Sequence, residues 1–132
     1  MNLNEYFAKT KGTGVLATAD ASGAVDAAIY ARPHFIDDET IAFIMADRLS
    51  HANLQSNPHA AYLFMEAGEG HKGKRLHLTK VGEETDRQKI ESIRRRPLPA
   101  ECGIKDTPRF LVYFEVDRVR PLVGDELEDK EE

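Results

Sequence analysis

Apolar positions recur along the chain with two spacings, and each spacing is typical of one kind of element. Helical spacing is present at residues 2–11, 50–56 and 83–96. Strand-length apolar runs cover residues 14–19, 25–32, 34–36, 40–45, 59–66, 74–81 and 108–123, the last as one or two strands. Most of these runs are separated by short polar turns, which are typical of antiparallel neighbours and not of parallel strands joined by helices.

The pattern therefore predicts a mainly β domain of about six strands with three small helices. A closed or split antiparallel barrel suits such a set because closure removes exposed strand edges. Pro33 interrupts the second strand, and since proline has no amide hydrogen the strand is expected to be bulged or unpaired there. Ser50 is expected to cap the middle helix, which ends at Pro58, and Pro97 is expected to end the last helix.

The charge of the chain is unevenly distributed over its 132 residues. Residues 125–132 hold six acids and one lysine, which accounts for the whole net charge of −5, so residues 1–124 are neutral. We expect one domain over residues 1–124 and an acidic, disordered tail over residues 125–132. Within the neutral part, residues 72–96 carry nine basic side chains against four acidic ones, which leaves room for a small-anion site.

Features that the sequence lacks exclude several classes of protein. No apolar run approaches the roughly 18–20 residues of a membrane span, and the first residues lack the pattern of a secretory signal. Cys102 is the single cysteine, so an internal disulfide and a multi-thiolate metal site are excluded. The five histidines lack metal-binding spacing, and the arginine triplet 94–96 lacks aromatic neighbours for nucleic acid. We expect a cytoplasmic protein with no membrane, metal or nucleic-acid partner.

Residues 46–57, ADRLSHANLQSN, are the stretch best suited to binding chemistry. The start of a helix presents free backbone amides and the positive end of the helix dipole, which together attract anions. Ser50 offers a hydroxyl, His51 an imidazole and Arg48 a guanidinium suited to bidentate phosphate contact. The alternative is structural, with Ser50 as a helix cap and Arg48 as a surface charge.

Two further stretches combine unusual backbone with charge. Residues 68–75, GEGHKGKR, have glycines that allow a ligand to approach closely, and Lys74 and Arg75 add charge. Their spacing is not that of a nucleotide-binding phosphate loop, and a flexible hairpin tip is the alternative. Residues 31–34, ARPH, combine a strand break with a cation and an imidazole, which could contact a ligand. An ordinary break in an edge strand is an equally good interpretation.

These segments occur in an order found in a known family. The chain resembles the pyridoxamine 5′-phosphate oxidase-like, FMN-binding split-barrel family in GVLATAD, YARPHFI, TIAFIMADRLSHANLQSNPHAAYLF, GKRLHLTKVG and FLVYFEVDRVRPLV. The resemblance extends to about residue 124, and the size matches the short, stand-alone members. It implies a six-stranded antiparallel split β-barrel that forms a homodimer, with one FMN at each of two interface sites.

The resemblance also implies a set of FMN contacts. It places the flavin ring against residues 30–34 and 46–47, and the phosphate in the loop and helix that follow. The implied cofactor-binding residues are Ala31, Arg32, Pro33, His34, Ala46, Asp47, Arg48, Ser50, His51, Asn53 and Lys74. Lys74 serves as a second phosphate arm in this interpretation. No catalytic residue is assigned, although His34 is a candidate proton relay because imidazole titrates near neutral pH.

The chain also differs from pyridoxamine phosphate oxidases themselves. It has no tryptophan, and its acidic tail replaces the basic, aromatic segment that closes their substrate pocket, which argues against vitamin B6 oxidation. The leading hypothesis is an FMN-binding flavoprotein oxidoreductase that acts on an unknown small-molecule redox substrate or electron donor. The alternative is a flavin-binding or electron-carrier module without its own substrate turnover. A barrel that has lost its flavin, or that binds a deazaflavin or heme, also stays open.

Overall fold

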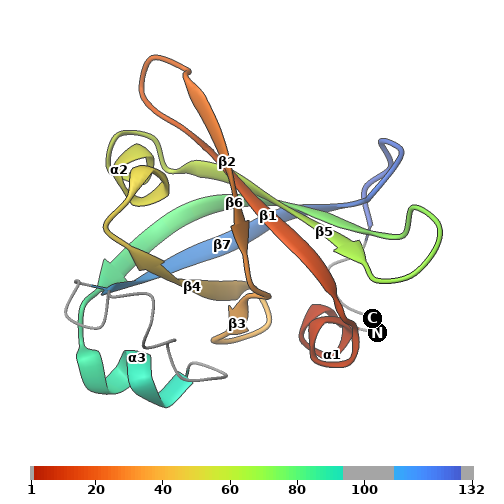
Figure 1. Ribbon diagram of the computed structural model, residues 1–132, viewed down its shortest axis with the longest axis horizontal. Helices are drawn as coiled ribbons and strands as arrows, with labels where there is room; N and C mark the ends of the chain where they lie inside the picture. The colour runs from red at the N-terminus through yellow and green to blue at the C-terminus, as the bar shows by residue number, and fades with distance from the viewer. Residues whose placement is uncertain (1, 94–108, 129–132) are drawn as a thin grey trace.

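Seven strands and three short helices make up the residues that this computed structural model describes, 2–93 and 109–128 (Figure 1). In chain order they are α1 (Leu3–Lys9), β1 (Gly12–Ala19), β2 (Val25–Tyr30), β3 (His34–Phe35), β4 (Thr40–Ala46), α2 (Leu49–Ser56), β5 (His59–Glu66), β6 (Gly73–Glu84), α3 (Arg87–Ile93) and β7 (Arg109–Pro121). Short polar side chains set several boundaries. Asn2 caps α1 by accepting from the Glu5 amide at 2.8 Å, and Asp20 closes the β1–β2 turn by accepting from the Ser22 amide at 2.9 Å.

The strands form one antiparallel sheet in the order β2-β1-β5-β6-β7-β4-β3. β2 and β3 are at its two edges, yet only residues 31–33 lie between them in the chain. A flat sheet of this kind would be roughly 28 Å wide at about 4.8 Å per strand, whereas the linker spans about 13 Å when fully extended. The sheet must therefore curl until its edges approach, and the result is a barrel split between β2 and β3.

The inner face of the curled sheet carries the core. Alternate residues of each strand point inward, so apolar side chains spaced by two gather on that face. The fully buried large side chains of this main core are Phe7, Leu16, Ile41, Met45, Tyr62, Phe64, Leu76, Leu78, Val112, Phe114 and Val116. Phe7 belongs to α1, which therefore closes one end of the barrel with its apolar face.

The other two helices lie on different parts of the sheet. α3 covers the outer side of β4 and β7, where Ile90 packs against Ala42 and Leu111 in a second, smaller cluster. α2 follows β4 and lies on the side of the molecule opposite α1 in Figure 1. Its Leu54 joins the main core. The barrel thus has one end closed by α1 and another region, at the start of α2, that is built mainly from polar residues.

The structure confirms the main prediction from sequence, a mainly β antiparallel split barrel with three small helices. The seventh strand is β3, a two-residue strand that begins directly after Pro33. The predicted interruption at Pro33 is also confirmed, because β2 ends at Tyr30 and residues 31–33 join no strand.

Two predicted boundaries are wrong. Arg48, not Ser50, is the N-cap residue of α2, so Ser50 lies inside the first helical turn. The last helix does not begin at residue 83, because β6 continues through Glu84. Asp86 starts α3 instead, where its carboxylate accepts from the Gln88 amide at 3.0 Å. The predicted helix end at Pro97, the triplet 94–96 and Cys102 lie outside the described residues.

The first part of the acidic tail lies against the sheet. The Glu128 amide donates to the Val119 carbonyl at 2.7 Å, and its carboxylate pairs with Lys74 Nζ at 2.7 Å. Residues 125–128 therefore have defined contacts, and residues 129–132 are not described. Among the helices of the described residues, none is long and apolar enough to cross a membrane.

Candidate functional site

The start of α2 brings together a cation, a hydroxyl and unpaired helix amides. Arg48 is exposed, caps the helix through its backbone only, and forms no ion pair within residues 2–93 and 109–128. Ser50, in the first turn of the helix, is only 4% exposed. The first amides of a helix have no partner within it, so this turn offers donors for an anion beside a free guanidinium.

Tyr30, the last residue of β2, completes this group from the neighbouring edge of the barrel. Burial raises the pKa of Tyr30, while a hydrogen bond from Ser50 and the charge of Arg48 act in the opposite direction. The phenol therefore lies within hydrogen-bonding reach of Ser50 and close to the Arg48 guanidinium. Arg48, Ser50 and Tyr30, together with the first turn of α2, are called the α2 site below.

A contact from the core holds the backbone beside the α2 site. The Tyr62 hydroxyl donates to the carbonyl oxygens of Ala31 at 3.0 Å and Tyr30 at 3.3 Å. To reach them, the tyrosine crosses Gly14 of β1, where a Cβ atom would collide with its hydroxyl. Glycine at position 14 is therefore required for the contact that fixes the end of β2.

Asn53 anchors α2 to the sheet from inside. It is 5% exposed, and its amide donates to Thr18 Oγ1 of β1 at 3.0 Å. A buried amide without a partner would cost about 1–3 kcal/mol, so this pair fixes the orientation of the helix. The contact of Asn53 with Thr18 therefore positions α2 on the sheet.

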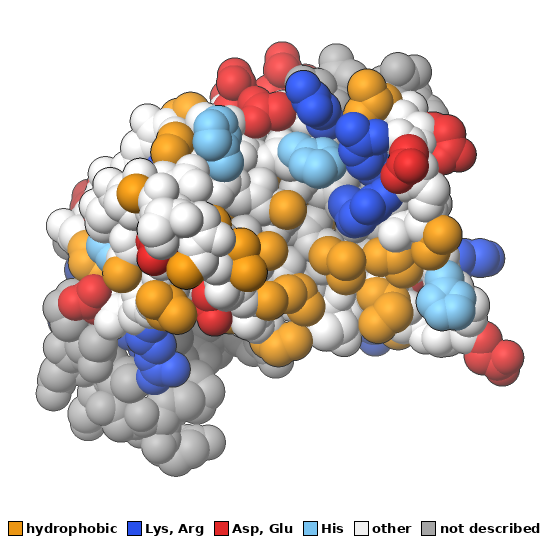
Figure 2. Space-filling view, turned by 90° about the horizontal axis from the view of Figure 1, so that it is seen from above, with side chains coloured by type: hydrophobic (Ala, Val, Ile, Leu, Met, Phe, Trp, Pro, Cys, Tyr) orange, Lys and Arg blue, Asp and Glu red, His pale blue; other side chains and the backbone are white. Residues whose placement is uncertain are grey.

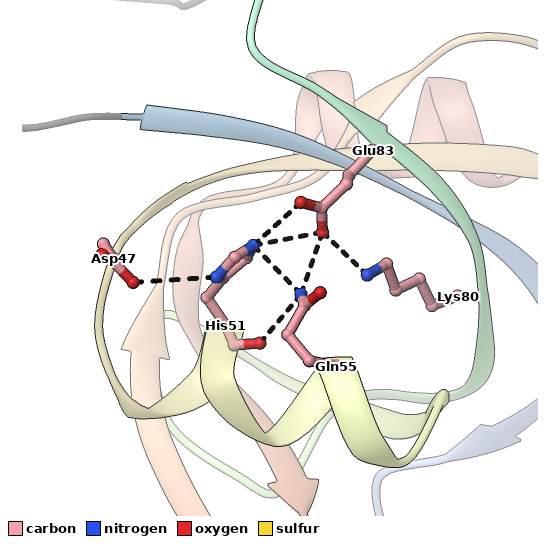
Figure 3. A network of polar contacts seen from close by, with 5 residues as sticks. All are labelled: Asp47, His51, Gln55, Lys80 and Glu83. Carbon is pink, nitrogen blue, oxygen red and sulfur yellow. Dashed lines mark hydrogen bonds and ion pairs between the residues drawn. The ribbon is translucent and has the colours of Figure 1, made fainter.

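His51 belongs to a second polar group, on the side of α2 that faces β6 and β7 (Figure 3). Its ring stacks on Phe110 with the ring centroids 3.8 Å apart and an interplanar angle of 13°. Nε2 lies 3.1 Å from each carboxylate oxygen of Glu83, and Nδ1 lies 3.9 Å from Asp47. Gln55 donates to Glu83 at 3.1 Å and so closes the group.

Glu83 is the centre of this network. Burial alone would raise its pKa, but hydrogen bonds from Lys80, Gln55 and His51 lower the pKa to about 2. Lys80 Nζ lies 2.7 Å from the carboxylate. A carboxylate held in its charged form by three donors ties the side of α2 to the end of β6.

The residues at the strand break point in different directions. Arg32 Nη1 donates to the carbonyl oxygens of Phe7 at 2.7 Å and Thr10 at 3.2 Å, where it satisfies the C-terminal end of α1. Pro33 is buried, and His34 begins β3 opposite Ala42. Ala31 is exposed, with its carbonyl bonded to Tyr62.

The remaining predicted residues lie at different distances from α2. Ala46 is the last residue of β4, Asp47 follows it, and both adjoin Arg48. Lys74 is in another part of the chain, because its ammonium pairs with Glu128 and lies 4.8 Å from the centroid of the Tyr6 ring in α1. Within one copy, Lys74 is therefore not part of the α2 site.

Sequence reasoning missed the supporting residues. The apolar pattern predicts a helix at Glu83, whereas the helix-capping residue Asp86, three positions later, indicates that Glu83 ends a strand. Phe110 and Thr18 carry no local signal, since their roles depend on which face of β7 and β1 meets α2. These residues can be identified only from the tertiary structure.

Comparisons with known proteins agree on the fold. No family model matches the chain, and no curated protein matches it. Among solved structures, an FMN-binding protein from Syntrophomonas wolfei is similar with a TM-score of 0.68 and 16% identity, covering 91% of this chain and 83% of that one.

Two further structures have the same fold. An F420 reductase is similar with a TM-score of 0.61 and 18% identity, covering 88% of this chain and 94% of that one. A putative pyridoxamine 5′-phosphate oxidase from Lactobacillus delbrueckii has a TM-score of 0.61 and 15% identity, with 88% of each chain covered. The chain therefore has the split-barrel fold of the pyridoxamine 5′-phosphate oxidase-like proteins, as its sequence predicted.

Proposed function

We propose that the chain is an FMN-binding flavoprotein oxidoreductase that acts on a small-molecule substrate. The observation that carries the proposal is the α2 site, where the exposed Arg48, the buried Ser50 and the free helix amides form an arrangement suited to a phosphate ester. The FMN-binding structure of the same fold supports it. The flavin, when bound, supplies the hydride or electron transfer, and the protein supplies position and electrostatics.

The residues present fit an FMN phosphate at this place. Arg48 and the hydroxyl of Ser50 would hold it, with the Ser50 proton donated to the phosphate and the Tyr30 phenol donating in turn to Ser50. Residues 31–34 and 46–47 would lie beside the flavin ring. Asn53 and His51 would act on the phosphate site indirectly, because their contacts with Thr18 and Glu83 hold α2 in place.

We also propose a homodimer that packs through the outer face of β2, β1 and β5. On this face Ile29 and Leu63 lie on either side of Val15, with Val25 and Met65 at its ends. Ile29 is 72% and Val25 81% exposed, although both belong to strands. Large apolar side chains gathered on one exposed face are typical of an interface, and a second copy offers the same surface.

The test of the cofactor is the absorption spectrum of the purified protein with and without added FMN. A yellow protein that releases FMN on denaturation supports the proposal, whereas protein that stays colourless with micromolar FMN contradicts it. Bound deazaflavin or heme would give a different spectrum and would contradict FMN as the cofactor. Bound FMN without oxidation or reduction of nicotinamides and small metabolites would assign the electron-carrier alternative instead of an oxidoreductase.

A further inference from the structure

Four basic side chains gather on the outer face of the sheet, on strands β6 and β7. The strand register places Arg75 opposite Arg120 and His77 opposite Arg118. Directly opposed residues share a face, and Arg75 and His77 alternate with the buried Leu76 and Leu78, so all four point outward. Figure 2 shows a group of basic side chains and a histidine beside the apolar part of the surface. These four residues are called the basic cluster.

The positive charge of the basic cluster is held in place without being neutralised. Arg75 donates to the backbone carbonyls of Pro121, at 2.9 Å, and Gly124, while Arg120 donates to that of Asp125. None of the three arginines forms an ion pair in the described part of the chain. Neutral carbonyl partners orient a guanidinium and leave its charge available to a ligand.

The lowered pKa of His77 reflects its burial and the positive charge around it. Arg120 Nε donates to His77 Nε2 at 3.1 Å, and only a neutral imidazole can accept there. Burial lowers the pKa of His77, and the charges of Arg120, Arg118 and Arg75 lower it further. Asp117 is the one group that raises it, and its carboxylate accepts from Thr79 Oγ1 at 2.5 Å. Of the charges that act on His77, three are guanidinium groups and one is a carboxylate.

The geometry points to an oxyanion-binding site at the basic cluster, for the phosphate or carboxylate group of a small molecule other than the flavin. Each arginine has five N–H donors, and contacts with the described residues use two of them on Arg75 and two on Arg120. Residues 1–124 as a whole are neutral, so the charge is local and suits a small ligand better than a long polyanion.

The basic cluster is separate from the α2 site. Tyr30 and Ser50 belong to the inner side, since Tyr30 packs against the main core, whereas Arg75 and His77 point away from that core. The proposal therefore does not depend on flavin binding. A colourless protein with an active basic cluster would contradict the cofactor proposal alone.

The test uses inorganic phosphate as the probe and the imidazole signals of His77 in NMR spectra as the readout. Titrations in phosphate and in chloride at equal ionic strength give the pKa of His77 in each. We expect phosphate to raise it by about one unit, since an anion within ~4–6 Å favours the charged imidazole. The exposed His59 and His71 should not respond and serve as references.

Matched variants separate the cluster from general charge effects. Arg118→Gln with Arg120→Gln should abolish the phosphate response, whereas Lys9→Gln with Arg87→Gln, which removes two exposed cations on helices, should keep it. No response of His77 in the unmodified protein would overturn the proposal. A response that survives in Arg118→Gln/Arg120→Gln would also overturn it.

A second experiment distinguishes a site for a separate ligand from a site for the flavin itself. FMN and riboflavin are titrated into the protein and into Arg118→Gln/Arg120→Gln. Unchanged affinity for both supports a site for a second anion. A loss of about tenfold for FMN with none for riboflavin would assign the cluster to the flavin phosphate and overturn the proposal.

Discussion

The α2 site and the basic cluster both offer arginine side chains to an anion, but they are supported in opposite ways. The α2 site has one guanidinium, its Ser50 is buried, and the backbone of its Tyr30 accepts a hydrogen bond from the buried Tyr62. The basic cluster has three guanidinium groups at the surface, and backbone carbonyls hold two of them, those of Arg75 and Arg120. Changes inside the barrel should therefore reach the α2 site and spare the basic cluster, and changes on the outer face should do the reverse.

The largest effect is expected on the outer face. Ile29→Arg places a charge in the proposed dimer interface, and a buried unpaired charge costs several kcal/mol, so the dimer should weaken by about 100-fold or more. Light scattering after gel filtration measures the mass. Ile36→Arg is the control, because Ile36 is 46% exposed and lies outside β2, β1 and β5. Dissociation by both variants, or by neither, would contradict the assignment of this face.

A change in the core should disturb the backbone beside the α2 site and spare the basic cluster. Gly14→Ala forces the Tyr62 hydroxyl away from the carbonyls of Tyr30 and Ala31, and overpacking should lower the free energy of unfolding by about 2–3 kcal/mol. Gly82→Ala is the control, since nothing lies within 4 Å of its added Cβ. Denaturant unfolding measures stability, and the His77 response to phosphate should stay. Equal stability of the two variants would refute this role of Gly14.

The Glu83 network predicts a dependence on pH. The pKa of Glu83 is lower in the folded chain, about 2, than its ordinary value of 4.5. Its stabilising contribution is therefore fully present above pH 4.5 and is lost as the pH falls toward 2. Glu83→Gln should cost about 1 kcal/mol at pH 7, after screening of this partly exposed group, and the difference should shrink at pH 3. A constant difference between pH 7 and pH 3 would show that the charge of Glu83 is not what matters.

The smallest effect is expected at Tyr30. Tyr30→Phe removes the hydroxyl that contacts Ser50 but keeps the ring against the core, so stability should fall by only about 0.5–1 kcal/mol. FMN affinity should fall about threefold, because Ser50 loses its orienting partner. Riboflavin binding, measured alongside, should change less. A greater loss for riboflavin than for FMN would place the phenol at the ring and not at the phosphate.

The sequence predicted those features that depend on neighbouring residues. The alternation of apolar side chains identified the strands, and Pro33 marked the break between β2 and β3. The run around Arg48 and Ser50 predicts an anion site at the start of α2, and that role stays a prediction. Each of these is decided within a few residues of chain. The curl of the sheet also follows, once the short linker 31–33 is known to join its two edges.

Features that depend on strand register stayed hidden. His77 and Arg118 are 41 positions apart in the chain and meet only because β6 pairs with β7. His51 was expected at a phosphate, and its stacking on Phe110 and contact with Glu83 required knowing which side of α2 faces β6. Net charge gave no hint of the basic cluster, since acidic side chains elsewhere cancel it.

The most direct test of the central claim, that the α2 site holds the phosphate of FMN, is calorimetric titration of FMN and riboflavin into Arg48→Ala/Ser50→Ala. Arg87→Ala, on the exposed face of α3, is the matched control. We predict a loss of FMN affinity of about tenfold or more in the double variant, with riboflavin affinity nearly unchanged. Unchanged FMN affinity, or an equal loss for riboflavin, would contradict the claim.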